Sequence, residues 1–157
     1  MKNIRTTVLC VCITLYNLSS FAQEQKIPIN EPDYNKPKLF SHLPDKIPVS
    51  IEKINEIITS PVGRTTGFRL SETSDFQFDG EVVSTASKYG NSIQSVVIRS
   101  GTYEGARLTI SKITNADGSI SYTGRIISFK HGDLYELQNQ NGQLILVKRN
   151  FYDLVNE

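Results

Sequence analysis

The sequence predicts a mainly β domain: an antiparallel meander of six to eight strands, forming a strongly curled sheet or a small barrel, with one N-terminal amphipathic helix packed on it. Two turns support this prediction. Asn141-Gly142 and Asn115-Ala-Asp-Gly118 each separate two segments in which apolar and polar residues alternate. Because such short turns join neighbouring strands, the pairing must be antiparallel. The pattern aromatic-x-Gly occurs at Phe78–Gly80 and again at Tyr122–Gly124, which indicates either two related three-strand units or a chance recurrence.

The first 22 residues have the layout of a secretory signal peptide. Lys2 and Arg5 provide a basic start, residues 7–16 form a mostly apolar run, and Ser20-Phe21-Ala22 places small residues before a cleavage point. The apolar run is shorter than the ~20 residues that a membrane span needs. We therefore expect no membrane span, and export to the periplasm or the extracellular space after cleavage near Ala22.

Both cysteines, Cys10 and Cys12, lie inside this predicted signal. The mature chain would then hold no disulfide, no thiolate metal site and no cysteine nucleophile. Removal of residues 1–22 also takes away two basic residues and no acidic one, which lowers the net charge from +1 to −1. A nucleic-acid partner is not expected, because proteins that bind nucleic acids carry a basic excess or a basic stripe.

Residues 23–48 are predicted to be an extended, proline-rich lead, which serves as a spacer or as a peptide arm for a partner. Each proline removes a backbone donor and favours extended geometry in the preceding residue. Near the end of the lead, Leu39, Phe40 and Leu43 are apolar enough to dock on the domain, which is predicted to span residues 49–157. Five of the six prolines lie in the lead, namely Pro28, Pro32, Pro37, Pro44 and Pro48.

One helix is predicted, from Ser50 to Thr59. Ser50 can cap the free amides of the first turn, and Glu52 lies where the helix dipole favours an anion. Pro61 ends the helix. A helix of about ten residues is marginal alone, so its apolar stripe must pack on the sheet. The stripe consists of Ile51, Ile54, Ile57 and Ile58.

From Gly67 onward the hydrophobic period changes from 3.6 to 2, which indicates strands. Val82-Val83 interrupts the alternation beside Gly80 and predicts a bulge or bend. The last hairpin allows a register to be predicted. If Asn141-Gly142 is a two-residue turn, Gln140 opposes Gln143, Asn139 opposes Leu144, and Leu137 opposes Leu146. A helical turn near residues 150–155 is expected to end the chain.

Catalytic and metal-binding patterns are not evident. His131-Gly-Asp133 is the one compact grouping that could transfer a proton or bind a metal, and His42 is the only other histidine. A metal site needs three or four converging ligands. We therefore expect no catalytic residue, no cofactor and no metal. A small hydrolase that uses His131 and Asp133 as an acid–base pair is kept as an alternative.

Binding is the function that these observations favour. We expect an exported, non-enzymatic β-domain that binds a protein or peptide through loops or an exposed sheet edge, since edges accept extended peptides. A second alternative is a small-molecule carrier, which requires an apolar cavity of ~300 Å³ or more. The aromatic residues named below either contribute to an aromatic–arginine surface or fill the core. The predicted binding surface consists of Tyr89, Arg99, Tyr103, Arg107, His131 and Asp133.

Three stretches carry a family resemblance. They are the end of the predicted signal peptide at Ser-Phe-Ala22-Gln23, the segment Gly90-Asn-Ser-Ile-Gln-Ser-Val-Val-Ile-Arg-Ser100, and the C-terminal segment from Asn141 to Glu157. They resemble uncharacterised small secreted proteins of Gram-negative bacteria, over roughly residues 40 to 157. The resemblance implies export and implies no particular activity or site residue.

Overall fold

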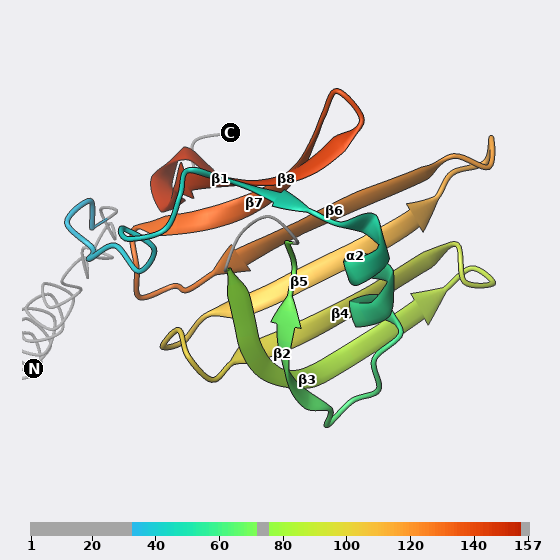
Figure 1. The fold of residues 1–157 in the computed structure, drawn as a ribbon, viewed down its shortest axis with the longest axis horizontal. Coiled ribbons are helices and arrows are strands. Elements are labelled where there is room, and N and C mark those ends of the chain that lie inside the picture. The colour runs from blue at the N-terminus through green and yellow to red at the C-terminus, as the bar shows by residue number, and fades with distance from the viewer. Residues whose placement is uncertain (1–32, 72–75, 155–157) are drawn as a thin grey trace, which may run out of the picture. The chain divides into compact units, whose positions relative to one another are not determined.

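A computed structural model describes residues 33–71 and 76–154. The predicted signal peptide, with Cys10 and Cys12, and the first part of the predicted lead lie outside these residues. The described chain forms one antiparallel sheet of eight strands, which curls into a half-barrel around a helix (Figure 1). This confirms the predicted fold class, with one difference in detail: the helix follows the first strand.

The spatial order of the strands is β1-β8-β7-β6-β5-β4-β3-β2. Strands β2 to β8 therefore form a meander, and β1 pairs with the last strand. In the described residues the helix α2 is too short to cross a membrane. In chain order, the elements are β1 (Lys46–Val49), α2 (Ile51–Ile58), β2 (Thr65–Arg69), β3 (Gln77–Lys88), β4 (Ile93–Ser100), β5 (Arg107–Thr114), β6 (Ile120–Ile127), β7 (Asp133–Gln140), β8 (Gln143–Asn150) and the 3-10 helix η2 (Phe151–Leu154).

The predicted turns and the predicted bulge are present. In the last hairpin Gln140 pairs with Gln143, and the pairing continues to Leu137 and Leu146 as predicted. Asn141 (φ 54°) and Gly142 (φ 84°) both adopt the left-handed conformation that a two-residue type I′ turn requires. The register of β3 against β4 shifts between Val82 and Ser84, which is the predicted bulge.

Two glycines allow the sheet to curl. A Cβ atom on Gly80 would lie 2.4 Å from the carbonyl oxygen of Arg99, and one on Gly124 would lie 2.6 Å from that of Thr109. No larger residue could bring the neighbouring strands so close at these points. They are the glycines of the two aromatic-x-Gly patterns, although the origin of the patterns by duplication stays a prediction.

Helix α2 occupies the concave side of the sheet. Its side chains Ile54, Ile57 and Ile58 are buried, whereas Ile51 is 41% exposed. Ser50 is the N-cap, because its hydroxyl accepts from the backbone amide of Lys53. Across the interface, Asn55 Oδ1 accepts from Lys112 Nζ at 3.2 Å and from the Tyr122 hydroxyl at 3.1 Å.

The second half of the predicted lead belongs to the same compact unit as the sheet. Its last residues form β1, which pairs with β8 from Lys46↔Val147 to Val49↔Leu144. Phe40 is fully buried against the rings of Tyr103 and Tyr135. The described part of the lead thus supplies both an edge strand and a core residue.

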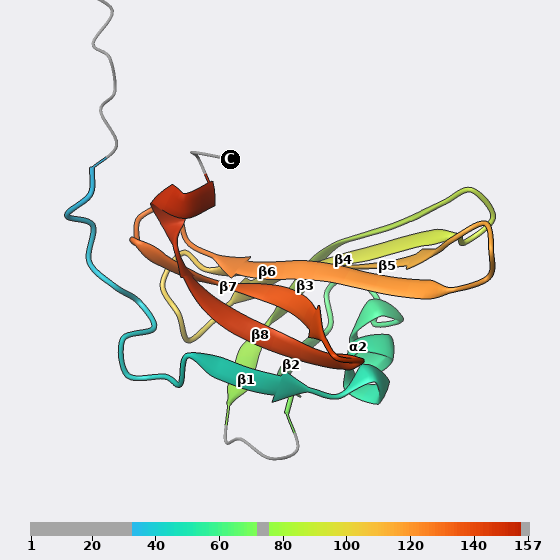
Figure 2. The ribbon, with the colours of Figure 1, turned by 90° about the horizontal axis from the view of Figure 1, so that it is seen from above.

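Strands β3 to β6 continue beyond their outer neighbours. Strand β2 pairs with β3 as far as Glu81, backbone hydrogen bonds of Gly63 and Arg64 extend this to Val82, and β7 pairs with β6 only over Gly124–Ile126. The continuation projects past α2 in Figure 2. We call it the ledge; it consists of Ser84–Lys88, Ile93–Val97, Thr109–Thr114 and Ile120–Thr123.

Candidate functional site

The residues of the predicted binding surface do not meet at one place. Tyr89 is 80% exposed in the turn between β3 and β4, at the tip of the ledge. Tyr103, His131 and Asp133 lie at the other end of the strands, in or beside the loops after β4 and β6. Only Arg99 and Arg107 are brought together, as exposed cross-strand partners on β4 and β5.

Tyr103 belongs to the core rather than to an open surface. Its ring stacks on Phe76 and Phe78 and meets Phe40 edge to face. Burial raises the pKa of the Tyr103 phenol, and the negative charge of Asp79 adds to the rise. For this residue, the interpretation that aromatic side chains fill the core describes the structure.

His131 and Asp133 each have a different partner. The buried Asp133 carboxylate accepts from the backbone amide of Leu39 at 2.6 Å and from that of Phe40 at 2.9 Å. His131 Nδ1 lies 2.8 Å from Ser128 Oγ. Asp133 therefore ties the lead to the sheet. Within residues 33–71 and 76–154, no group of three or more His, Cys, Asp or Glu side chains is placed to hold a metal ion.

A cavity between α2 and the sheet measures about 10 Å³. Its walls are apolar and include Ile54, Leu108 and Leu137. A site for a drug-sized ligand needs roughly 300 Å³ or more. This cavity therefore gives no support to the carrier alternative.

An open groove of about 470 Å³ crosses the outer face of β2, β3 and β4. Gly67 and Gly80 line it without side chains, between the carboxylates of Asp79 and Glu81 and the guanidinium of Arg99. Arg99 Nη2 donates to Glu81 Oε2 at 2.6 Å, so the charges of this pair are matched within the groove.

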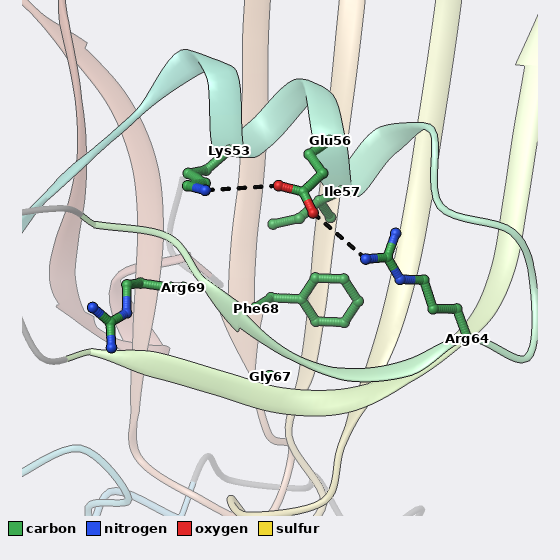
Figure 3. A pocket seen from close by; sticks show the side chains of 7 residues that line it. All are labelled: Lys53, Glu56, Ile57, Arg64, Gly67, Phe68 and Arg69. Atoms are coloured by element: carbon green, nitrogen blue, oxygen red, sulfur yellow. Dashed lines mark hydrogen bonds and ion pairs between the residues drawn. The ribbon is translucent and has the colours of Figure 1, made fainter.

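A smaller pocket of about 110 Å³ lies between α2 and β2. Figure 3 shows Lys53 and Glu56 extending from the helix, and Arg64 and Arg69 on the strand side, with the Phe68 ring between the two arginines. We call it the α2–β2 pocket; its remaining lining residues are Ile57 and Gly67.

The two outermost strands of the sheet are protected against further pairing. Strand β1 has four residues, includes Pro48, which lacks an amide proton, and begins with Lys46. Helix α2 lies beside β2, and the backbone amide of Ser50 donates to the carbonyl of Leu70 at 3.1 Å where the two edges approach. Short strands, prolines, lysines and covering elements are the usual means of preventing edge-to-edge association.

The ledge has two free edges of its own, and the edge on β6 lacks the proline and the lysine that protect β1. Its residues Ile120–Thr123 include no charge and no proline, and Ile120 is 51% exposed. The corresponding edge of β3, Ser84–Lys88, follows a bulge and ends in a lysine. We call Ile120–Thr123 the β6 edge.

The register fixes which backbone groups the β6 edge presents. Asn115 donates to the carbonyl of Ser119, whereas the amide of Thr114 is directed to β4 and donates to Ser92. Because backbone groups alternate along an antiparallel strand, Ser121 and Thr123 bond to β5, and Ile120 and Tyr122 point outward. The β6 edge was not among the predicted residues. The signal in the sequence is a run free of charge and proline between Ser119 and Gly124.

Comparison with known proteins gives no match: no family model, no curated protein and no solved structure is similar to this chain.

Proposed function

We propose that the protein is an exported, non-enzymatic binding module that holds an extended segment of a partner protein or peptide by strand addition at the β6 edge. One observation carries the proposal: among the described residues Ile120–Thr123 is a strand edge without a pairing partner, and it contains no proline and no charged residue. The exported location rests on the signal-peptide layout of residues 1–22.

The added strand would occupy the same side of β6 as β7. Strand β7 already pairs with Gly124–Ile126, so an added strand would continue that ladder outward along the ledge. The amides and carbonyls of Ile120 and Tyr122 would supply sequence-independent hydrogen bonds. Ile120 and Tyr122 also share one face, so their side chains would select β-branched or aromatic residues opposite them. The edge carries no charge, which favours a partner segment that is itself uncharged.

Proline substitution offers a direct test, because proline removes only the outward amide at a free edge. Nine-residue peptides are selected from a random phage-displayed library on the purified protein. The affinity of these peptides is then measured for the variants Ile120→Pro and Thr85→Pro. Thr85→Pro is the matched control, because the Thr85 amide points outward from the β3 edge as that of Ile120 does from the β6 edge. We expect Ile120→Pro to weaken binding at least about tenfold, and Thr85→Pro to leave it unchanged.

Amide hydrogen exchange adds a readout by residue. Bound peptide should slow exchange at Ile120 and Tyr122 and leave Thr85 and Ser87 unchanged. Equal affinity for both proline variants, each shown to be folded by circular dichroism, would contradict the proposal. Protection of Ile120 and Tyr122 that grows with protein concentration alone would also contradict it, because the occupant would then be a second copy.

A further inference from the structure

The α2–β2 pocket is lined by more cations than carboxylates. Three cations, Lys53, Arg64 and Arg69, line it with one carboxylate, Glu56, so the lining carries a net charge of +2. Ile57 and Phe68, both nearly fully buried, form its apolar floor. Charges beside such a low-dielectric floor interact more strongly than charges in open water.

The Glu56 carboxylate forms ion pairs with two of these cations. Its Oε2 lies 3.8 Å from Lys53 Nζ, and its Oε1 lies 3.5 Å from Arg64 Nη2. Arg64 also donates from Nη1 to Ser60 Oγ at 3.1 Å. Both of its terminal nitrogens are therefore engaged, and Glu56 with Arg64 closes one side of the pocket.

Arg69 has no such partner. No hydrogen bond or ion pair joins its guanidinium to any residue in the described part of the chain. In Figure 3, Arg69 and Lys53 lie on the same side of the Phe68 ring, on opposite walls of the pocket, and Arg64 lies on the other side. Arg69 is thus the one cation of this lining without a carboxylate partner in the described part of the chain, and Lys53 shares its carboxylate, Glu56, with Arg64.

We infer that the α2–β2 pocket binds a small oxyanion, a carboxylate or a phosphate group, between Lys53 and Arg69. The guanidinium fork of Arg69 matches two oxygens of such a group, and Lys53 supplies a point charge from the helix. A volume of about 110 Å³ admits an oxyanion with few further atoms and excludes an extended strand. The site is therefore separate from the β6 edge and does not depend on the proposed function.

Titration with inorganic phosphate and with acetate, each at constant ionic strength with chloride as the replaced anion, tests this site. It also distinguishes a phosphate ligand from a carboxylate ligand. Backbone amide shifts of Lys53 and Gly67 should move in a saturable way at millimolar anion. Saturation by phosphate alone assigns a phosphate group, and saturation by acetate alone assigns a carboxylate. Saturation by both supports the shared oxyanion chemistry.

Arg69→Gln should lower the affinity for the anion at least about fivefold, because it removes a charge-assisted contact. It should not alter the thermal midpoint, since no hydrogen bond or ion pair holds the exposed Arg69 guanidinium to another described residue. Arg107→Gln is the matched control, an exposed arginine on the outer face of β5. Shifts that rise linearly without saturation, or equal weakening by both variants, would overturn the inference.

Discussion

The ledge and the remainder of the described chain, which we call the body, belong to the same antiparallel sheet, yet they differ in which elements cover them. In the body, α2 and the lead cover the concave face, and Phe40 and Tyr135 are fully buried. In the ledge, α2 contacts the strands where Asn55 accepts from Lys112 and Tyr122, whereas the side chains of Tyr89 and Ile120 are 80% and 51% exposed (Figure 2). Stability is therefore concentrated in the body, and the ledge is free to present strand edges to a partner.

The largest contrast is expected from truncating one apolar side chain in each region. Phe40→Ala should destabilise the protein by about 3–5 kcal/mol, because it removes a buried ring that contacts Tyr103 and Tyr135. Ile120→Ala in the ledge should cost less than about 1 kcal/mol. Urea denaturation of both variants measures the difference. Similar costs would show that the ledge shares the core's packing.

The next contrast compares two aspartates that each accept two hydrogen bonds. Asp133→Ala should cost about 2–4 kcal/mol, because the partly buried amide of Leu39 and the buried amide of Phe40 lose their acceptor. Asp117 accepts from the amide and hydroxyl of Ser119 at the exposed end of the ledge. Asp117→Ala should leave the urea midpoint nearly unchanged. A large effect at Asp117 would place the ledge turn within the cooperative unit.

Alkaline pH should affect the body through Tyr135. Burial, together with the charges of Asp45 and Asp133, raises the pKa of its phenol far above the ordinary value of 10.0. A pKa raised by folding means that stability is complete below pH 10 and falls as the pH rises further. Tyr135→Phe, which also loses the 2.5 Å hydrogen bond to the Pro44 carbonyl, should reduce this slope. Denaturation midpoints between pH 8 and pH 11 provide the measurement, and an unchanged slope would contradict the assignment.

Acid should produce the smallest effect in the exposed turn of the ledge. Hydrogen bonds from Ser119 hold the pKa of Asp117 below its ordinary value of 3.8. A lowered pKa contributes stability above the unfolded value and loses it as the pH falls through the folded value. Amide exchange in residues 115–119 should accelerate below that range while the amides of β7 stay protected. Simultaneous acceleration in β7 would show that the two regions open together.

The sequence predicted what local chemistry determines. The turn at Asn141-Gly142 sets the register of β7 and β8, and that register was predicted pair by pair because both strands lie beside the turn. Ser50 and the isoleucine stripe likewise located α2 within a residue at each end.

The partners in contacts between distant parts of the chain were not predicted, although docking of Phe40 on the domain was. The prolines of the lead predicted extended geometry, and Pro48 lies in β1, an edge strand, where proline is tolerated; the pairing of β1 with β8 was not predicted. Asp133 was predicted to belong to a binding surface, and its structural role was missed because its partners, Leu39 and Phe40, lie more than 90 positions earlier in the chain. The β6 edge depends on where β7 stops pairing, which no property of Ile120–Thr123 alone reveals.

The pairing of β1 with β8 has a consequence for how the domain is assembled. The strands join residues about 100 positions apart, so this ladder closes the longest loop of the sheet and should form after the local hairpins. Synthesis from the N-terminus presents β1 long before β8 exists. Deleting either β1 or β8 would remove the same ladder, so these two segments stabilise the fold together although they lie near opposite ends of the described chain.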